Sequence, residues 1–474
     1  MEAEMRCNYL HGIKKIRNYD QLISHGDIEA RIKVLQLMDA VLQDVDAGKR
    51  IQEIMSLDGD ILTIGERSWD ISKKKNIYLI GAGKACNAMA QAVCDVMGER
   101  ISRGIISVKV KEEHDHYFNT EVYVGGHPLP NEEGMKAARR MLELINQAGS
   151  DDLFISVFSG GSSALLTYPV NGITLEDEIA TQDILLKSGA KIIEINAVRR
   201  HISRTNGGRL AEMICKEKGA ELISIMVGDS VGQPPTSNRG KPVVFYGTPV
   251  AADDTTIQDA RNMIVNYNLG KKLPKSVIDF IWDDDKVMET PKQFDDKLTT
   301  FLVGSLADSC ESAIAAANNM GIPYIILTTF LEGESREAGQ FLSSIAREVK
   351  TMKRPITPPC FVICAGETTT RIDSPPKGIG GPSQELVLGL SIGIRNFQCI
   401  AGASIDTEGT DGPTIYAGGI VDGSTIDRFE AVNINVYEAL RTHVTGNALM
   451  SIGDNIFTGN TGTNLCDLNV IYIY

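Results

Sequence analysis

Short apolar runs rich in β-branched residues alternate along the chain with longer segments in which apolar residues recur every three or four positions. The runs predict strands at residues 76–81, 104–110, 153–158 and 221–228, and the periodic segment 84–98 predicts a helix after the first of them. Strands that alternate with helices in this way are typical of a parallel sheet flanked by helices. We therefore expect an α/β fold.

A polar segment at residues 287–297 is poor in core-forming side chains and separates this series of strands from a second one. The second series consists of the runs TTFLVGS, IPYIILTTF, FVICAGE, QCIAGAS and NVIYIY. We place a domain boundary near residue 290. The expected architecture is a larger, Rossmann-like N-terminal domain with a parallel sheet, residues 1–290, and a smaller C-terminal α/β domain, residues 291–474.

The length and charge of the chain narrow the classes of function. Its 474 residues, 43% of them hydrophobic, are enough for two or three domains, each with its own core. The net charge of −14 argues against a dedicated surface for nucleic acid or for an anionic membrane. No run approaches the roughly 18 uninterrupted apolar residues of a membrane span, and the N-terminal segment has no apolar signal core.

The cysteines indicate the compartment. There are nine of them, an odd number, and none falls in a CxxC pair. Several lie in apolar, strand-like runs, which is typical of reduced core thiols in a cytosolic protein. We expect a soluble cytoplasmic protein.

Two glycine-rich turns follow predicted strands directly. In the segment SVFSGGSSALL, Gly160 and Gly161 would let the backbone approach a ligand, and Ser162 or Ser163 could cap the next helix while offering a hydroxyl. In open α/β sheets, ligands bind at the carboxyl ends of the strands, where helix N-termini present unpaired N–H groups. For one such segment taken alone, a tight strand-to-helix turn without a ligand is the favoured interpretation.

The second turn, GAGKAC, carries Gly81, Gly83 and Lys84 after the strand at residues 76–81. A dinucleotide fingerprint would need glycine where Cys86 stands, and the GxxxxGK[ST] loop of many nucleoside triphosphatases is absent. A lysine at a helix N-terminus is unfavourable unless it binds an anion. We interpret Lys84 as an anion-binding residue, the alternative being a lysine that extends into water.

Eight segments follow one another from about residue 76 to the C-terminus: GAGKACNAMA, GGHPLPNEEG, SVFSGGSSALLTYPVNGITLED, SGAKIIEINAVRRHIS, NGGRLA, AGETTT, DTEGTDGPTIYAGGIVDG and TGNTGTNLCDL. In this order they resemble the glycerate 2-kinase family. The C-terminal part of that family is called the MOFRL domain, and its members include proteins formerly named hydroxypyruvate reductases.

The resemblance implies two α/β domains with a cleft between them and phosphorylation of the 2-hydroxyl of D-glycerate by ATP with Mg²⁺. It implies catalytic roles for Lys84, Asp229 and Arg199, with Lys84 neutralising the phosphoryl group in transfer. It implies Asp229, Asp406 and Asp411 as metal ligands. The residues implied in nucleotide binding are Gly81, Gly83, Ser159, Gly160, Gly161, Ser162, Ser163, Glu367 and Thr368. His127, flanked by proline, is interpreted as structural.

Three positions depart from the family pattern. Pro382 replaces an arginine expected near the substrate, Gln233 replaces an aspartate, and Asn206 replaces a lysine. A proline can neither clamp a carboxylate nor donate a hydrogen bond, so the sequence predicts weaker recognition of glycerate than of some other small hydroxylated compound, unless another base such as Arg199, Arg200 or Arg371 takes over.

Two other classes of function stay open at this point. One is a non-catalytic relative that binds a nucleotide or metabolite, and the other is a hydroxypyruvate reductase, which the missing dinucleotide fingerprint disfavours. The expected partners are a nucleotide and a small-molecule substrate, with neither nucleic acid nor membrane, and a homodimer is an open possibility for the assembly.

Overall fold

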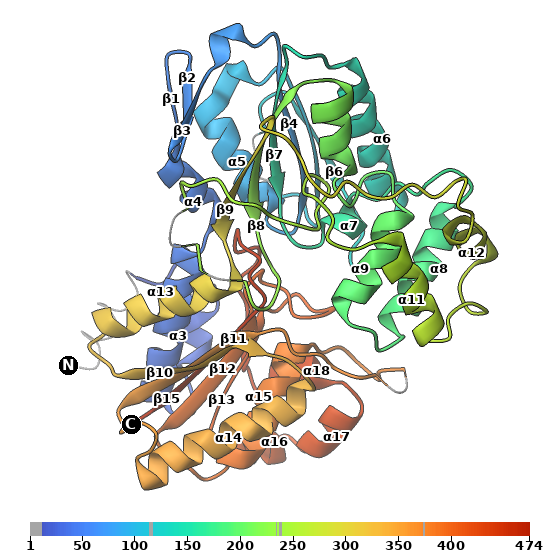
Figure 1. Cartoon of the computed structure of the whole chain (residues 1–474). Helices are drawn as coiled ribbons and strands as arrows, with labels where there is room; N and C mark the ends of the chain where they lie inside the picture. The colour runs from blue at the N-terminus through green and yellow to red at the C-terminus, as the bar shows by residue number, and fades with distance from the viewer. Residues whose placement is uncertain (1–11, 113–116, 234, 237–238, 373–374) are drawn as a thin grey trace. The chain divides into compact units, whose positions relative to one another are not determined.

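The computed structural model describes residues 12–112, 117–233, 235–236, 239–372 and 375–474. The chain forms two compact units (Figure 1). Unit 1 contains Met1–Arg50, Gly228–Ser237 and Gly304–Tyr474, and unit 2 contains Ile51–Val227 and Asn238–Val303.

Unit 2 is built on a six-stranded sheet in the order β6-β5-β4-β7-β8-β9. The pairs from β6 to β8 are all parallel, as predicted. The strands are β4 (Ile77–Gly83), β5 (Arg103–Val108), β6 (Thr120–Val124), β7 (Leu153–Phe158), β8 (Glu221–Val227) and β9 (Leu298–Gly304). Strands β4 and β7 are buried over their whole length, which explains their unbroken apolar sequence.

Helices and a small antiparallel sheet complete unit 2. Helices α5 (Cys86–Met97) and α6 (Glu132–Gln147) pack along the sheet, while α7 (Ser162–Leu165), α10 (Arg209–Ala211) and a π-helical turn (Glu212–Glu217) are short. A separate apolar cluster joins α8 (Leu175–Leu186), α9 (Ile192–His201), α11 (Ile257–Asn266) and α12 (Lys275–Ile281). The small sheet contains β1 (Met55–Asp58), β2 (Ile61–Ile64) and β3 (Arg67–Asp70), preceded by α4 (Ala47–Ile54) and followed by a 3₁₀ turn (Ile71–Lys73); another 3₁₀ turn (Gly98–Arg100) follows α5.

Unit 1 has a mixed sheet in the order β10-β11-β15-β12-β13-β14. Strand β15 (Asp467–Ile473), the last of the chain, lies antiparallel between β11 (Cys360–Gly366) and β12 (Ile400–Asp406). The remaining strands are β10 (Tyr324–Leu331), β13 (Gly418–Asp422) and β14 (Asn455–Ile456). The α/β class is confirmed in both units, but only β10 and β11 pair in parallel here.

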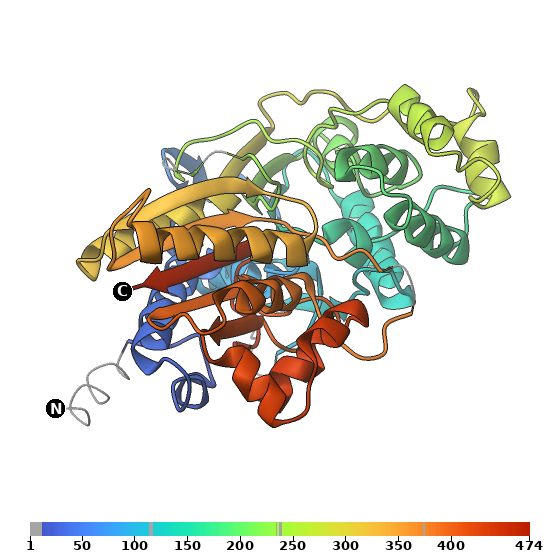
Figure 2. The ribbon, with the colours of Figure 1, turned by 90° about the horizontal axis from the view of Figure 1, so that it is seen from below.

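Helices cover both faces of this sheet. Helices α3 (Ile28–Asp44) and α13 (Leu306–Asn319) lie on one face, and α14 (Ser335–Met352) and α15 (Pro382–Ile394) lie on the other, which Figure 2 shows from the side of α14. The shorter helices are α2 (Tyr19–Leu22), α16 (Thr425–Ala431), α17 (Val436–Arg441) and α18 (Thr445–Ser451). An apolar core joins α14 and α15 to the sheet.

The two units differ from the predicted domains 1–290 and 291–474. The first fifty residues belong to unit 1, because α3 buries Leu35 and Met38 completely and contacts β15 and β12. Its Arg31 is also fully buried and donates hydrogen bonds to Asp422 and Asp454 of the same unit. The chain enters unit 1 again at residues 228–237 before it returns to unit 2.

Two further sequence expectations can be compared with the described residues. Eight cysteines are described, all unpaired and seven of them buried, and Cys7 lies outside the described residues. None of the helices that the structure describes is long and apolar enough to span a membrane.

Candidate active-site groups

The two glycine-rich turns of unit 2 meet, because β4 and β7 are parallel neighbours whose carboxyl ends lie side by side. The main-chain N–H of Lys84 donates to the carbonyl of Gly160 at 3.0 Å. The hydroxyl of Ser159 accepts a hydrogen bond from the N–H of Ala85, also at 3.0 Å. A side chain at Gly83 would place its Cβ 2.1 Å from the Ser159 hydroxyl, so this approach requires glycine.

Gly161 stands at the centre of this junction. Its φ of +82° lies in the left-handed region, and a Cβ there would lie 3.0 Å from the His127 ring and 3.2 Å from Cγ of Lys84. Gly161 is also the N-cap residue of α7, and no side chain caps this helix. The prediction that Ser162 or Ser163 caps it is therefore wrong. Ser162, at the first position of α7, is buried.

His127, for which the sequence favours a structural role, places its ring against the Gly161 turn. Its sequence position, in a proline-flanked loop after β6, gave no sign of this contact. Imidazole is a hydrogen-bonding and protonatable group, so its presence adds a second side chain beside Lys84 that can interact with an anion.

Arg199 lies near the end of α9 in the helical part of unit 2. Its guanidinium donates to the side-chain oxygens of Asn196 at 3.3 Å and Gln182 at 3.2 Å, and its Nε has no hydrogen-bond partner among the described residues. Desolvation lowers the pKa of Arg199 to about 10, although the neighbouring carboxyl of Glu178 opposes this shift. Burial in turn raises the pKa of Glu178.

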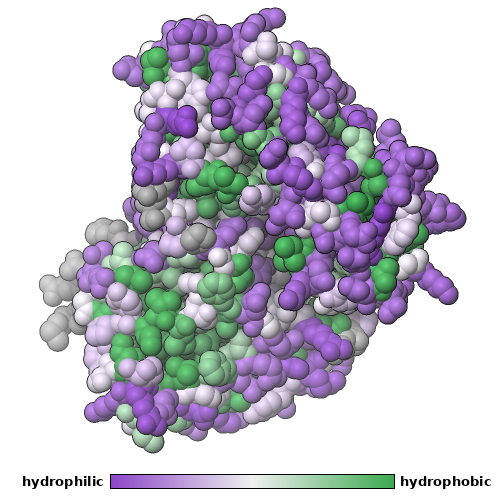
Figure 3. Space-filling model, in the orientation of Figure 1, coloured by the Kyte–Doolittle hydropathy of each residue, from purple (hydrophilic) through white to green (hydrophobic). Residues whose placement is uncertain are grey.

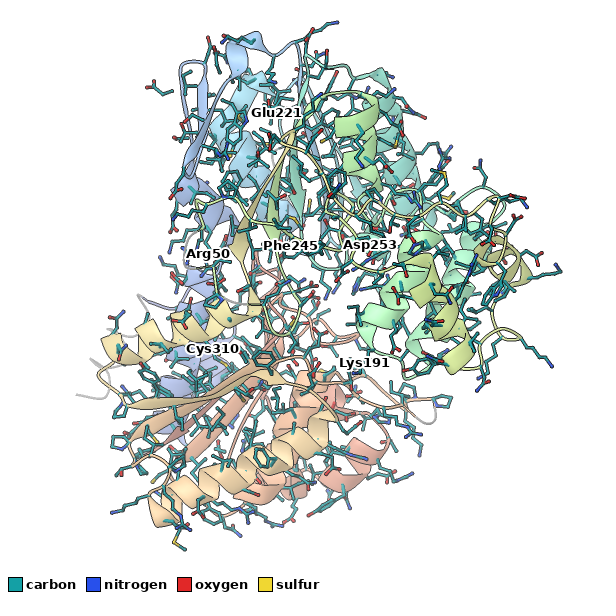
Figure 4. All side chains as sticks on the ribbon, viewed as in Figure 1. Arg50, Lys191, Glu221, Phe245, Asp253 and Cys310 are labelled. Atoms are coloured by element: carbon teal, nitrogen blue, oxygen red, sulfur yellow. The ribbon has the colours of Figure 1, made fainter. Side chains whose placement is uncertain are left out.

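The adjacent Arg200 differs from Arg199. It forms ion pairs with Asp253 at 2.7 Å and with Asp254 at 3.2 Å, and Asp253 is labelled in Figure 4 on the segment that leads into α11. Two carboxylates therefore already neutralise Arg200. Arg199 has only amide partners at hydrogen-bond distance, which leaves it the stronger candidate of the two for an anionic ligand.

A second group of predicted residues lies in unit 1, at the edge where β11 ends, β12 ends and β15 begins. Asp406, the last residue of β12, is the register partner of Asp467, the first residue of β15. Asp467 is paired in the same way with Gly366, which immediately precedes Glu367. Topology thus brings together three acidic residues that are far apart in the sequence.

The carboxyl of Asp467 shows the electrostatic result of this arrangement. It is buried, and burial together with the neighbouring carboxyls of Asp406, Glu367 and Asp411 raises its pKa above the ordinary range of aspartate. Sequence reasoning missed Asp467 because it opens an apolar strand. A sign was available, since it is the one charged residue in the strand DLNVIYI.

Asp229 follows β8 and belongs to the segment of unit 1 at residues 228–237. Its carboxylate accepts a hydrogen bond from the side-chain amide of Asn464 at 3.4 Å, and its main-chain carbonyl accepts one from the thiol of Cys466 at 2.8 Å. Asn464 and Cys466 come from the segment just before β15. Asp229 is therefore anchored on the segment that also presents Asp467.

Asp411, one of the expected metal ligands, lies at the N-terminus of α15. Its carboxylate accepts hydrogen bonds from the main-chain N–H groups of Ser383 at 3.1 Å and Gln384 at 2.8 Å, in the first turn of α15. Burial raises the pKa of Asp411 to about 7. This geometry favours the role of a helix cap, in which both carboxylate oxygens are already used.

The remaining predicted positions can be placed briefly. Pro382 is the first residue of α15, where a missing N–H costs little. Thr368 is buried and accepts a hydrogen bond from the hydroxyl of Ser335 at 3.0 Å. The side chain of Gln233 folds over Gly228, and Asn206 is buried against Ser203. In the described part of the chain, no three or more His, Cys, Asp or Glu side chains are arranged so that they could hold a metal ion, and this includes the three acidic residues at the edge of the sheet in unit 1.

Comparison with known proteins places these groups in a family. Residues 33–282 match a family model described as a domain of unknown function, DUF4147, and residues 360–467 match the MOFRL family. The chain is 36% identical to the glycerate 2-kinase of Pyrococcus horikoshii over 433 residues, which cover 91% of this chain and 94% of the relative. The chain belongs to the glycerate 2-kinase family.

A further relative and a solved structure support this family assignment. The D-glycerate 2-kinase of Thermotoga maritima is 36% identical over 392 residues, which cover 83% of this chain and 89% of that one. A crystal structure of glycerate kinase from Thermotoga maritima superposes with a TM-score of 0.72 at 32% identity, covering 93% of this chain and 98% of that chain. The predicted family, the α/β fold and a kinase function are confirmed, and neither alternative class is favoured.

Proposed function

We propose that this protein transfers a phosphoryl group from ATP to the 2-hydroxyl of D-glycerate in a reaction that requires Mg²⁺. The observation that carries the proposal is the junction in unit 2, where the Lys84 turn is bonded to the turn at Gly160 and Gly161. The names of the relatives, glycerate 2-kinase in Pyrococcus horikoshii and D-glycerate 2-kinase in Thermotoga maritima, support the choice of reaction.

We assign the phosphates of ATP to this junction. The Gly160–Ser163 turn can offer main-chain N–H groups and hydroxyls, while the ammonium group of Lys84 would neutralise charge that develops on the transferred group. Phosphoryl transfer depends mainly on positioning and on charge neutralisation, so a fixed lysine beside a glycine turn is suited to it.

We assign the carboxylate of glycerate to Arg199. The arginine that the family pattern led us to expect at position 382 is a proline here, so another cation must hold the substrate's negative charge. Arg200 is neutralised by Asp253 and Asp254, whereas the guanidinium of Arg199 retains an unpartnered Nε within the described residues. A bound carboxylate would restore the pKa of Arg199 toward its ordinary value.

The carboxylates of unit 1 fit a magnesium ion. Mg²⁺ binds through one or two carboxylates together with phosphate oxygens and water, so it does not need a cage of three protein ligands. Asp406, Glu367 and Asp467 supply hard oxygen donors, and a cation among them would relieve the repulsion that raises the pKa of Asp467. Asp229, anchored by Asn464, is a further carboxylate of unit 1, and we assign one or two of these four acids as direct ligands of the ion. When bound, Mg²⁺ would supply positive charge that favours phosphoryl transfer.

The test is an assay of ADP release with D-glycerate, ATP and Mg²⁺. Parallel reactions contain glycerol, L-glycerate, or hydroxypyruvate with NADH, and one contains EDTA. We expect ADP release that depends on D-glycerate and stops with EDTA, without oxidation of NADH. Oxidation of NADH without ADP release would support the reductase instead, and activity that persists in EDTA would contradict the magnesium assignment.

A further inference from the structure

Strand β10 forms one edge of the sheet in unit 1, and no strand among the described residues pairs with its other side. Its sequence, YIILTTFL, contains no charge and no proline. Edge strands of soluble proteins are usually protected by lysine, proline or an inward-pointing charge, because their free N–H and C=O groups can pair with another chain. Strand β10 carries none of these side chains.

Helix α14 presents an apolar stripe toward the same edge. Its opposite side packs against α15, where a Cβ at Gly339 would meet Leu386 and where Gly393 approaches Ser343. At 100° per residue, Phe341, Ile345 and Met352 fall on the side of α14 that faces away from α15. Phe341 is 61% exposed and Met352 is 62% exposed.

The edge and the stripe together form one surface, which we call the β10 face: strand β10 with Phe341, Ile345 and Met352. Figure 3 shows hydrophobic residues gathered over this part of unit 1. Phe330, near the end of β10, adds another exposed ring at 62%. Contiguous apolar patches of this kind mark sites of association.

The charges at the two ends of the β10 face are complementary to each other. The end at which β10 leads into α14 carries Glu332, Glu334 and Glu337 with one opposing residue, Arg336. The end at which α14 terminates carries four basic residues with one opposing residue, Glu348; the basic residues are Arg347, Lys350, Lys353 and Arg354. A second copy turned by a two-fold axis would place the acidic end of each face opposite the basic end of the other.

We propose that the β10 face binds a second copy of this chain, with the two β10 strands antiparallel about a two-fold axis. The sheet of unit 1 then continues from one subunit into the other. An axis perpendicular to the sheet keeps both α14 helices on the same face, so the two apolar stripes pack against each other. A single two-fold rotation thus pairs the free edges of the two β10 strands, buries both apolar stripes and brings opposite charges together.

The first experiment measures the mass of the full-length protein by size-exclusion chromatography with light scattering at micromolar concentration. We expect twice the 51.5 kDa of the single chain. Phe341→Glu should raise the dimer dissociation constant by about 30-fold or more, as for the loss of a central aromatic contact of about 2 kcal/mol. Tyr437→Glu is the matched control, because Tyr437 is an aromatic residue of unit 1 with 65% exposure on α17.

A charge exchange tests the antiparallel arrangement without removing apolar surface. Glu337→Lys and Lys353→Glu should each weaken the dimer by a few fold, and the double variant should recover the wild-type dissociation constant. Thermal unfolding checks that every variant is folded. A monomeric wild-type protein would overturn the proposal, as would a dimer that withstands Phe341→Glu, or equal disruption by Tyr437→Glu, or a double variant as weak as its parents.

Discussion

The two glycine-rich turns of unit 2 and the acidic edge of unit 1 differ in how their local structure is stabilised. The acidic edge is the group of Asp406, Glu367 and Asp467. The turns are fixed by main-chain hydrogen bonds and by glycines that allow close approach, as at Gly83 and Gly161. The acidic edge is crowded with like charges, and the pKa of Asp467 is raised in consequence. The turns of unit 2 are therefore stable without a ligand. The like charges of the acidic edge repel one another until a cation or a proton neutralises part of them.

This difference predicts which substitutions impair the chemistry and which impair the stability of the fold. Removing the side-chain charge of Lys84 should impair the chemistry and spare the fold, because the loop is held through its backbone. Replacing Gly161, whose left-handed backbone conformation favours glycine, should impair both the chemistry and the fold. Replacing a buried acid that caps a helix should mainly change the stability and its dependence on pH.

The largest effect is expected for Lys84→Ala. We predict a loss of kcat on the order of 10²-fold or more, as for the removal of one well-placed electrostatic group, with little change in thermal stability. Steady-state kinetics and thermal unfolding measure the two quantities. Lys136→Ala, in the exposed part of α6, should behave as wild type. Full activity of Lys84→Ala would remove the basis for assigning phosphates to this junction.

Next comes Arg199→Ala, which tests whether an arginine of unit 2 holds the substrate carboxylate. A lost charge-assisted pair is worth about 2 kcal/mol or more, so KM for D-glycerate should rise by about 30-fold or more while KM for ATP stays near its original value. Arg200→Ala, which breaks the ion pairs with Asp253 and Asp254, should reduce stability more than substrate affinity. Equal effects of both variants on KM would contradict the assignment.

A smaller effect is expected for Gly161→Ala. The new Cβ would approach His127 and Lys84 in a left-handed backbone conformation that costs alanine about 1–2 kcal/mol. We predict about a tenfold fall in kcat/KM for ATP. Gly172→Ala is the matched control, because Gly172 has a φ of +95° with nothing within 4 Å of its Cβ position. If Gly172→Ala lowers activity equally, strain rather than the contact at the junction explains the result.

The subtlest prediction concerns Asp411. Its folded-state pKa of about 7 lies above its unfolded value, so its ionisation in the buried site opposes folding. The contribution of Asp411 to the free energy of unfolding should fall as pH rises from about 4 to about 7 and then level off. Unfolding measured over this range should show a weaker pH dependence for Asp411→Asn than for the wild type. A change only in the Mg²⁺ requirement, with equal pH slopes for both proteins, would support Asp411 as a metal ligand instead.

The sequence alone predicts the position of groups that follow strands directly. Lys84, Gly160 and Gly161 each come just after an apolar run, and parallel strands place such residues at one edge of a sheet. Asp406 and Glu367, which the family resemblance implies, also lie at the ends of strands. The α/β class and the parallel sheet of unit 2 followed from the alternation of strands and helices.

Other features depend on tertiary contacts that no local pattern reveals. His127 reaches the Gly161 turn from a loop after an unrelated strand, and Asp467 gains its raised pKa only because β15 inserts antiparallel between β11 and β12. The placement of the first fifty residues in unit 1 depends on the packing of α3 on that sheet. Asp411 could not be identified as a cap, since the helix that it caps begins nearly thirty positions earlier in the sequence.

In the proposed reaction, the phosphoryl group of ATP is transferred to the 2-hydroxyl of D-glycerate. The most direct measurement is ³¹P NMR of the product formed from ATP, Mg²⁺ and D-glycerate by the wild-type protein and by Lys84→Ala. We expect the wild type to form 2-phosphoglycerate and the variant to form almost none. Formation of 3-phosphoglycerate, release of inorganic phosphate without a phosphorylated product, or equal yields from both proteins would contradict it.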